Sequence, residues 1–130
     1  MSIALISCGK SKREGIHAAQ DLYIGSYFKK TLAYTKKHHD QIYILSAKYG
    51  LITLDQPIES YELKITQLIK ADRNLWGLGV IKQMRIKELD KHDIYIYAGK
   101  PYYELLIPYL PKANIMFEGL SIGHRMKAMS

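Results

Sequence analysis

Four short apolar runs recur along the chain, and each one ends on a glycine or alanine with a charged residue beside it. They span residues 3–6, 42–45, 94–97 and 115–117. A short apolar run of this kind is typical of a strand buried inside a parallel sheet. The carboxyl ends of parallel strands lie along one edge, where open α/β sheets bind their ligands. The sequence therefore predicts one functional site, built where these four runs end.

The stretches between the runs carry apolar residues at helical spacing, so strands and helices alternate. Helices are expected over residues 21–39, 74–91, 101–109 and 121–129. This alternation predicts an α/β fold, a three-layer α/β/α sandwich around a four-stranded, mostly parallel sheet. Residues 48–73 fit no single element, because turn residues and a proline interrupt them. This segment is either a loop that covers a substrate or an excursion packed on the flank of the domain.

Length and charge narrow the class of protein. With 130 residues, 48% of them hydrophobic, the chain fits a single α/β domain over residues 1–130. A formal net charge of +7 favours an anionic partner, either nucleic acid or a nucleotide. The single cysteine excludes an internal disulfide and indicates a reducing compartment. No leader-like start and no run of about 18 apolar residues is visible, so we expect a cytoplasmic protein without a membrane partner.

Glycines, lysines and tyrosines gather near the four strand ends. Glycines let a ligand approach the backbone, lysines supply positive charge, and tyrosine rings can stack on a base or simply pack at half-buried positions. No P-loop and no dinucleotide-binding glycine pattern is present. The predicted substrate-binding residues are Ser7, Gly9, Lys10, Tyr23, Ser46, Lys48, Tyr49, Gly50, Tyr61, Gly99, Tyr102 and Gly119.

Four residues are candidates for catalysis, and each has an alternative role. Cys8, next to two lysines, is a nucleophile or a small packing residue. Lys12 is a nucleophile or a phosphate ligand. Asp21 is an acid–base group or a helix cap. Glu118 at the tip of the fourth run has no capping role, so it is a candidate contact for a base or sugar. The five histidines show no metal spacing, and we expect neither a metal nor another cofactor.

Several motifs resemble a small uncharacterised domain family of bacteria and their viruses. They are SCGKSK at 7–12, DLY at 21–23, ILSAKYGL at 44–51, AGKPY at 98–102 and EGLSIG at 118–123. The match covers nearly the whole chain. The architecture is also similar, more remotely, to the uracil-DNA glycosylase superfamily. Cys8 and Lys12 are spaced as at the start of the archaeosine synthase core motif, which implies that Lys12 serves chemistry on a base.

Two functions from different classes follow from these features. The first is an enzyme that processes a nucleobase or nucleotide, either by cleaving the N-glycosidic bond as a DNA glycosylase-like hydrolase does, or by modifying the base. The alternative is a non-catalytic protein that binds a nucleotide or nucleic acid, sequesters it or regulates a partner. A purely structural component of an assembly is a third interpretation. The binder would keep the glycines, lysines and tyrosines but would need no positioned carboxylate or thiol.

Overall fold

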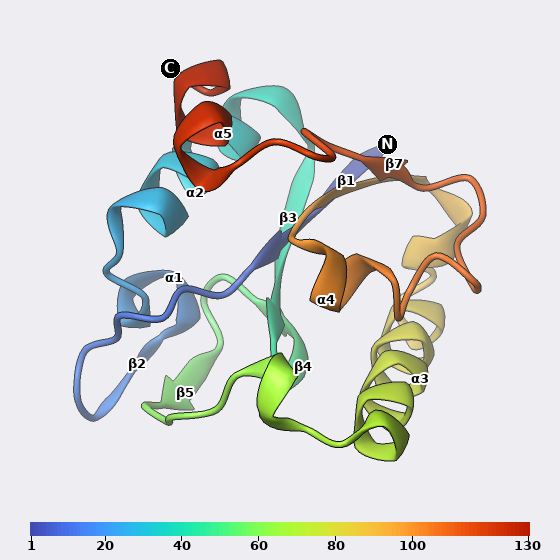
Figure 1. The fold of residues 1–130 in the computed structure, drawn as a ribbon, viewed down its shortest axis with the longest axis horizontal. Coiled ribbons are helices and arrows are strands. Elements are labelled where there is room, and N and C mark those ends of the chain that lie inside the picture. Colours follow the sequence, from blue (N-terminus) through green and yellow to red (C-terminus); the bar gives the residue numbers. More distant parts are fainter.

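The computed structural model describes residues 1–130 and has a five-stranded main sheet in the order β4-β3-β1-β6-β7 (Figure 1). Neighbouring strands are parallel except for β3 and β4, so the expected mostly parallel sheet is confirmed. The strands are β1 (Ser2–Ser7), β3 (Gln41–Ser46), β4 (Gly50–Thr53), β6 (Asp93–Tyr97) and β7 (Asn114–Ile115).

The sheet has five strands where the sequence predicted four, and the extra strand is β4. Gly50 adopts a φ of +74°, which lets the chain reverse after β3 and pair back on it as a hairpin. The start of segment 48–73 is thus part of the sheet. A separate antiparallel pair, β2 (Ile16–Ala18) with β5 (Pro57–Glu59), lies beside the main sheet.

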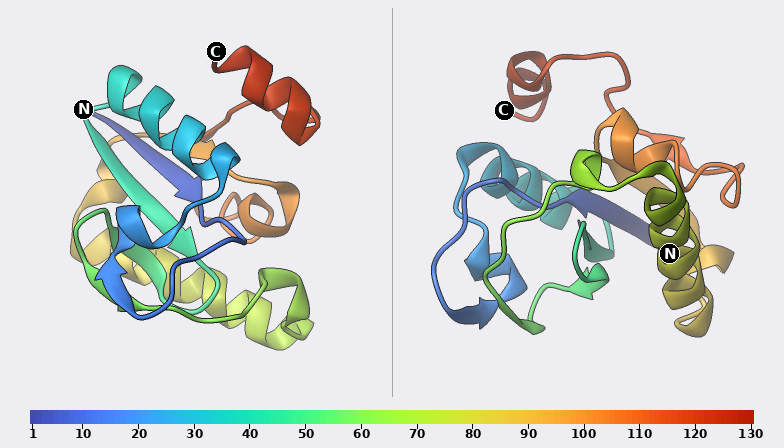
Figure 2. Two further views of the ribbon diagram at one scale, coloured as in Figure 1. Left: turned by 90° about the vertical axis from the view of Figure 1, so that its left-hand side faces the viewer. Right: turned by 60° about the horizontal axis from the view of Figure 1, so that its bottom comes forward.

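Helices cover both faces of the sheet (Figure 2). They are α1 (Ala19–Leu22), α2 (Ser26–His38), α3 (Lys70–Ile86), α4 (Lys100–Tyr103) and α5 (Ile122–Ala128), with short 3-10 turns η1 (Ile65–Gln67) and η2 (Leu89–Lys91). Two predicted helix starts were wrong. Asp21 lies inside α1 rather than capping a helix, and α3 begins at Lys70 rather than near Asn74. None of the helices combines the length and the apolar character needed to cross a membrane.

The strand β1 runs through the middle of the core. Ile3 and Leu5 pack into a cluster with the α3 residues Val80 and Met84. Ala4 and Ile6 point to the opposite face and join a second cluster with Phe28 of α2. Successive side chains of a strand face opposite sides, so an unbroken apolar run is what a strand covered on both faces requires.

The chain changes direction across the sheet at β1. From β1 it passes through α2 to β3 on one side, and it later returns through α3 to β6 on the other side. The carboxyl ends of β1 and β6 are therefore neighbours from which the connections diverge. Such a topological switch point is where open α/β sheets leave a crevice for a ligand.

Candidate functional site

Two cavities flank the loop that follows β1. One has a volume of about 540 Å³ and the other about 700 Å³. Both are lined by Cys8, Gly9 and Lys10 from this loop and by Gly99, which follows β6. The shared residues thus lie at the topological switch point, where two of the four apolar runs end.

The smaller cavity, here called the thiol cavity, lies between the β1 loop, α4 and the segment before α3. Residues 62–67 supply six of its thirteen lining residues. Part of segment 48–73 therefore forms a wall of the cavity, as a loop that covers a substrate would. The lining residues are Cys8, Gly9, Lys10, Lys12, Glu62, Leu63, Lys64, Ile65, Thr66, Gln67, Gly99, Pro101 and Tyr102.

Cys8 contacts a tyrosine from the far end of the chain. Its Sγ lies 3.4 Å from the Tyr102 hydroxyl, although the two residues are 94 positions apart. Burial, and then the nearby Cys8, raise the pKa of Tyr102 above its ordinary value. The hydroxyl therefore stays protonated at neutral pH and can donate its hydrogen to the sulfur. Such a donor stabilises charge on sulfur, which a nucleophilic thiol needs.

Lys12 is held above two tyrosine rings. Its Nζ donates a hydrogen bond to the Lys10 carbonyl at 3.1 Å and lies 4.6 Å from the centre of the Tyr61 ring and 5.8 Å from that of Tyr23. These contacts are a carbonyl dipole and two π faces, which orient an ammonium without neutralising it. No carboxylate pairs with Lys12, since the chain's one ion pair joins Lys91 to Glu88. Its charge is thus available to an anion in the cavity.

The hydroxyls of these two tyrosines belong to a buried series of hydrogen bonds that also includes Ser46. The Tyr61 hydroxyl lies 2.6 Å from that of Tyr23 and 2.7 Å from Ser46 Oγ. Ser46 Oγ also accepts the backbone N–H groups of Lys48 and Tyr49. Burial, with a contribution from the nearby thiol, raises the pKa of Tyr23 to about 12 and raises that of Tyr61 as well. This row of hydrogen-bonded hydroxyls connects three segments that are distant in the sequence. It fixes the position of the Tyr61 ring, over which the Lys12 ammonium lies.

The larger cavity, here called the arginine cavity, lies between the β1 loop, the start of α2 and α5. Its distinguishing residue is Arg125, which is buried. None of the lining residues is acidic. They are Ser7, Cys8, Gly9, Lys10, Ser11, Gly25, Ser26, Tyr27, Phe28, Thr31, Gly99, Leu120, Ser121, Ile122 and Arg125.

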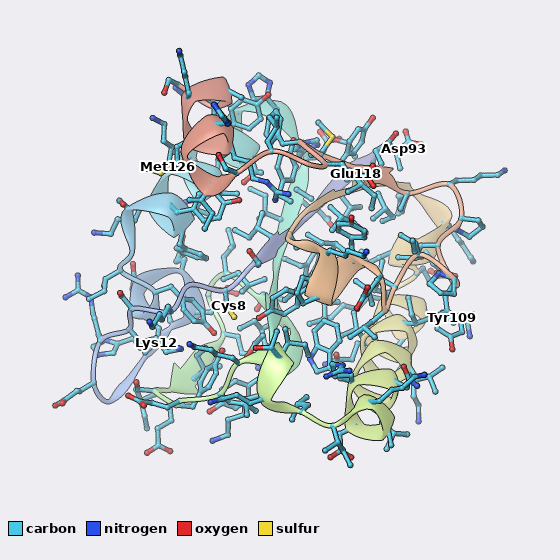
Figure 3. The ribbon with its side chains drawn as sticks, viewed as in Figure 1. Cys8, Lys12, Asp93, Tyr109, Glu118 and Met126 are labelled. Carbon is cyan, nitrogen blue, oxygen red and sulfur yellow. The ribbon has the colours of Figure 1, made fainter.

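The four candidate catalytic residues separate into two pairs. Cys8 and Lys12 both line the thiol cavity. Asp21 and Glu118 line neither cavity and are exposed, Asp21 on α1 and Glu118 where its Oε1 accepts the Tyr103 hydroxyl at 3.5 Å. Figure 3 shows Glu118 well apart from Cys8. The structure therefore brings together the thiol and the amine but not the two carboxylates.

The candidate binding residues fall into three groups. Five line a cavity: Ser7, Gly9, Lys10, Gly99 and Tyr102. Three form the hydroxyl chain behind the cavities: Tyr23, Ser46 and Tyr61. Four line neither cavity: Lys48, Tyr49, Gly50 and Gly119.

Several cavity residues were not predicted from the sequence, and two of the charged ones stand out. Glu62 is the only carboxylate of the thiol cavity, and Arg125 is the buried cation of the arginine cavity. Glu62 directly follows the candidate Tyr61, which is the one local signal that pointed to it. Arg125 had no such signal, because a single arginine in a basic helix looks like a surface residue. No three residues among the histidines, cysteine and acids lie close enough together to hold a metal ion.

Comparison with known proteins identifies a family without an assigned activity. A family model described as "Family of unknown function (DUF6884)" matches residues 3–130, nearly the whole chain. The expected relationship to an uncharacterised domain family is thereby confirmed. No curated protein and no solved structure matches the chain.

Proposed function

The chain belongs to DUF6884, a family of unknown function, and we propose from its site that it is an enzyme acting on a nucleobase or nucleotide in the thiol cavity. The observation that carries this proposal is the convergence of the Cys8 thiol, the Tyr102 hydroxyl and the Lys12 ammonium on one cavity at the sheet's switch point. A thiol, a proton donor and a fixed cation are together the equipment of nucleophilic catalysis.

The size and polarity of the cavity support a base-containing substrate. Ligand sites for small molecules usually measure about 300–1,000 Å³, and the thiol cavity has about 540 Å³. Tyr102 is its aromatic residue, and a ring at the cavity wall offers a face on which a base can stack. Thr66 and Gln67 add a hydroxyl and an amide that can hydrogen-bond to the edge of a base. The net charge of +7 favours a phosphorylated substrate.

The arrangement favours base modification over cleavage of the glycosidic bond. In base modification, the Cys8 thiol loses its proton to solvent and the sulfur adds to the carbon of an electrophilic ring double bond. The π electron pair of that bond moves to the neighbouring ring atom, where Lys12 stabilises the negative charge. Glycosidic cleavage needs a carboxylate beside the sugar, and neither Asp21 nor Glu118 lines the cavity. Glu62, the carboxylate that does line the cavity, would have to be the one that acts beside the sugar. The resemblance to the glycosylase superfamily and to archaeosine synthase stays a prediction.

A non-catalytic binder is the second candidate, and one specific observation favours it. The cavities keep Lys10, Gly9 and Gly99 from the residues expected for binding, but neither carboxylate expected for catalysis. A protein that sequesters a nucleotide or nucleic acid would need nothing more. The two functions differ in whether a bound ligand is chemically changed.

The deciding experiment combines a binding screen with product analysis. Nucleobases, nucleosides, nucleotides and short single strands are screened by thermal shift, and each ligand that binds is then analysed by mass spectrometry after incubation. For an enzyme, we expect Cys8→Ala to abolish the product while the dissociation constant changes less than about threefold. Lys12→Met should weaken binding and turnover together. Lys82→Met is the matched control, because Lys82 is exposed on α3 and lines neither cavity.

Three outcomes would contradict the enzyme. They are a ligand that binds without any product, a product that forms equally well with Cys8→Ala, and the absence of any base-containing ligand. The first outcome, together with a loss of binding in Lys12→Met, would establish the binder instead.

A further inference from the structure

Arg125 of α5 is buried without a partner for most of its guanidinium group. The residue is 8% exposed, and its Nε donates one hydrogen bond, to the Leu120 carbonyl at 3.0 Å. The other four N–H groups of the guanidinium have no acceptor in the protein, and no carboxylate forms an ion pair with it. The terminal nitrogens keep only a small contact with solvent, so a largely buried guanidinium of this kind is favoured when an anion binds to it. Arg125 lines the arginine cavity, so the compensating anion has a place to bind.

The start of α2 supplies a second, independent set of donors to the same cavity. Ser26, Tyr27 and Phe28 are its first three residues, and their backbone N–H groups have no acceptor in the protein. The N-cap is Gly25, which offers no side chain, and the first turn contains no acidic residue. All four residues line the cavity. Free amides at the positive end of a helix dipole form a site for an anion.

The remaining wall is also suited to an anion. Lys10 is exposed and lines the cavity together with Ser7 and Ser11, whose hydroxyls can donate hydrogen bonds. No acidic side chain opposes them anywhere in the lining. A guanidinium fork, three convergent amides and a flexible ammonium match the several oxygens of a phosphoryl group better than the two of a carboxylate.

We propose that the arginine cavity is a phosphate-binding subsite formed by Arg125, the first turn of α2 and Lys10. It takes the phosphoryl group of a nucleotide or of a nucleic-acid backbone, and the substrate is therefore phosphorylated rather than a free base or nucleoside. The subsite shares Cys8, Gly9, Lys10 and Gly99 with the thiol cavity, so one ligand can occupy both. That the rest of the ligand is a nucleobase or nucleoside bound in the thiol cavity rests on the proposed function.

The test uses the full chain and measures binding by isothermal titration calorimetry. The probes are inorganic phosphate, a nucleoside, the corresponding 5′-mononucleotide and a short single strand without a terminal phosphate. We expect inorganic phosphate to bind the wild-type protein and the 5′-nucleotide to bind at least about tenfold more tightly than its nucleoside. A gain confined to the mononucleotide would identify a terminal phosphate as the ligand, and a comparable affinity for the strand would identify a backbone phosphate.

Two variants remove the subsite by different means. Arg125→Met removes the guanidinium, and Ser26→Asp places a carboxylate at the start of α2. Ser26 is exposed and an acid in the first turn favours the helix, so Ser26→Asp should fold at least as well as the wild type. Each variant should weaken phosphate and nucleotide binding roughly tenfold or more and leave nucleoside binding within about twofold. The control Arg85→Met, at a residue that is exposed on α3 and lines neither cavity, should bind like the wild type.

The inference is overturned if inorganic phosphate does not bind, or if Ser26→Asp binds phosphate as the wild type does. Its failure is distinguishable from failure of the proposed function. Turnover of a nucleoside that gains nothing from a phosphate would refute the subsite and leave the enzyme intact. Binding of phosphate that Arg125→Met and Ser26→Asp abolish, without a product from any base-containing ligand, would support the subsite and refute the enzyme.

Discussion

Replacing Tyr61 with phenylalanine removes the central hydroxyl of the buried chain that joins Tyr23, Tyr61 and Ser46. The hydroxyl makes two short contacts, 2.6 Å to the Tyr23 hydroxyl and 2.7 Å to Ser46 Oγ. Tyr23 and Ser46 are fully buried, so water cannot replace the lost partner. Ser46 keeps two backbone N–H donors, whereas Tyr23 loses the only side-chain partner of its hydroxyl.

The magnitude follows from the number of hydrogen bonds lost. A buried hydrogen bond contributes about 1 kcal/mol, so Tyr61→Phe should lower the free energy of unfolding by about 2 kcal/mol and Tyr23→Phe by about 1 kcal/mol. The double variant should lose about 2 kcal/mol rather than the additive sum of about 3 kcal/mol, because both single variants break the same Tyr23–Tyr61 bond. The coupling energy of the pair is therefore about 1 kcal/mol.

Urea unfolding followed by the fluorescence of Trp76, the chain's one tryptophan, measures all four proteins of this cycle. Tyr109→Phe is the matched control, since Tyr109 is 43% exposed and makes no side-chain hydrogen bond, and it should change stability by less than about 0.5 kcal/mol. If the effect of the double variant equals the sum of the two single effects within about 0.3–0.5 kcal/mol, the coupled hydroxyl chain is refuted.

Three further measurements test the packing and the titrating groups. Gly77→Ala should destabilise the protein by about 1–3 kcal/mol, because its Cβ would lie 2.7 Å from the Leu105 carbonyl oxygen. Gly79→Ala, whose Cβ would have nothing within 4 Å, should stabilise it by about 0.5–1 kcal/mol, and equal effects of the two variants in urea titrations would contradict this packing. Burial raises the pKa of Tyr23 from 10.0 to about 12, so the unfolded chain loses this proton first and stability should fall from pH 10 upward, less steeply in Tyr23→Phe. Burial, and then the neighbouring His38, lower the pKa of His39 from 6.5, so the unfolded chain gains this proton first and stability should fall below pH 6.5. A Tm-against-pH profile that His39→Gln leaves unchanged would contradict the His39 assignment.

The site differs from what its most visible sequence features suggested. Asp21 at the start of an expected helix and Glu118 at the tip of a strand were candidate catalytic carboxylates, but both are exposed and line neither cavity. Exposed carboxylates are well solvated, and their position in the sequence carries no information about which cavity they face. Cys8 and Lys12, two alternative nucleophiles in the sequence, line the same cavity because the loop that holds them is short and follows a central strand.

The sequence alone indicated the alternation of strands and helices and the edge of the sheet at which the two cavities lie. Apolar periodicity and turn residues act over a few neighbours, so local patterns such as residues 3–6 record them faithfully. The hairpin strand β4 could not be predicted from such patterns, because its four residues lie in a segment interrupted by turn residues.

Only the tertiary structure decided which residues share a cavity. Tyr102 contacts Cys8 although the two residues are 94 positions apart in the sequence. Residues 62–67, which belong to the segment between β5 and α3, line the same cavity. Arg125 is buried because α5 packs against α2, not because of any pattern around it. These contacts depend on how complete elements pack against one another, and no local preference of the chain encodes that packing.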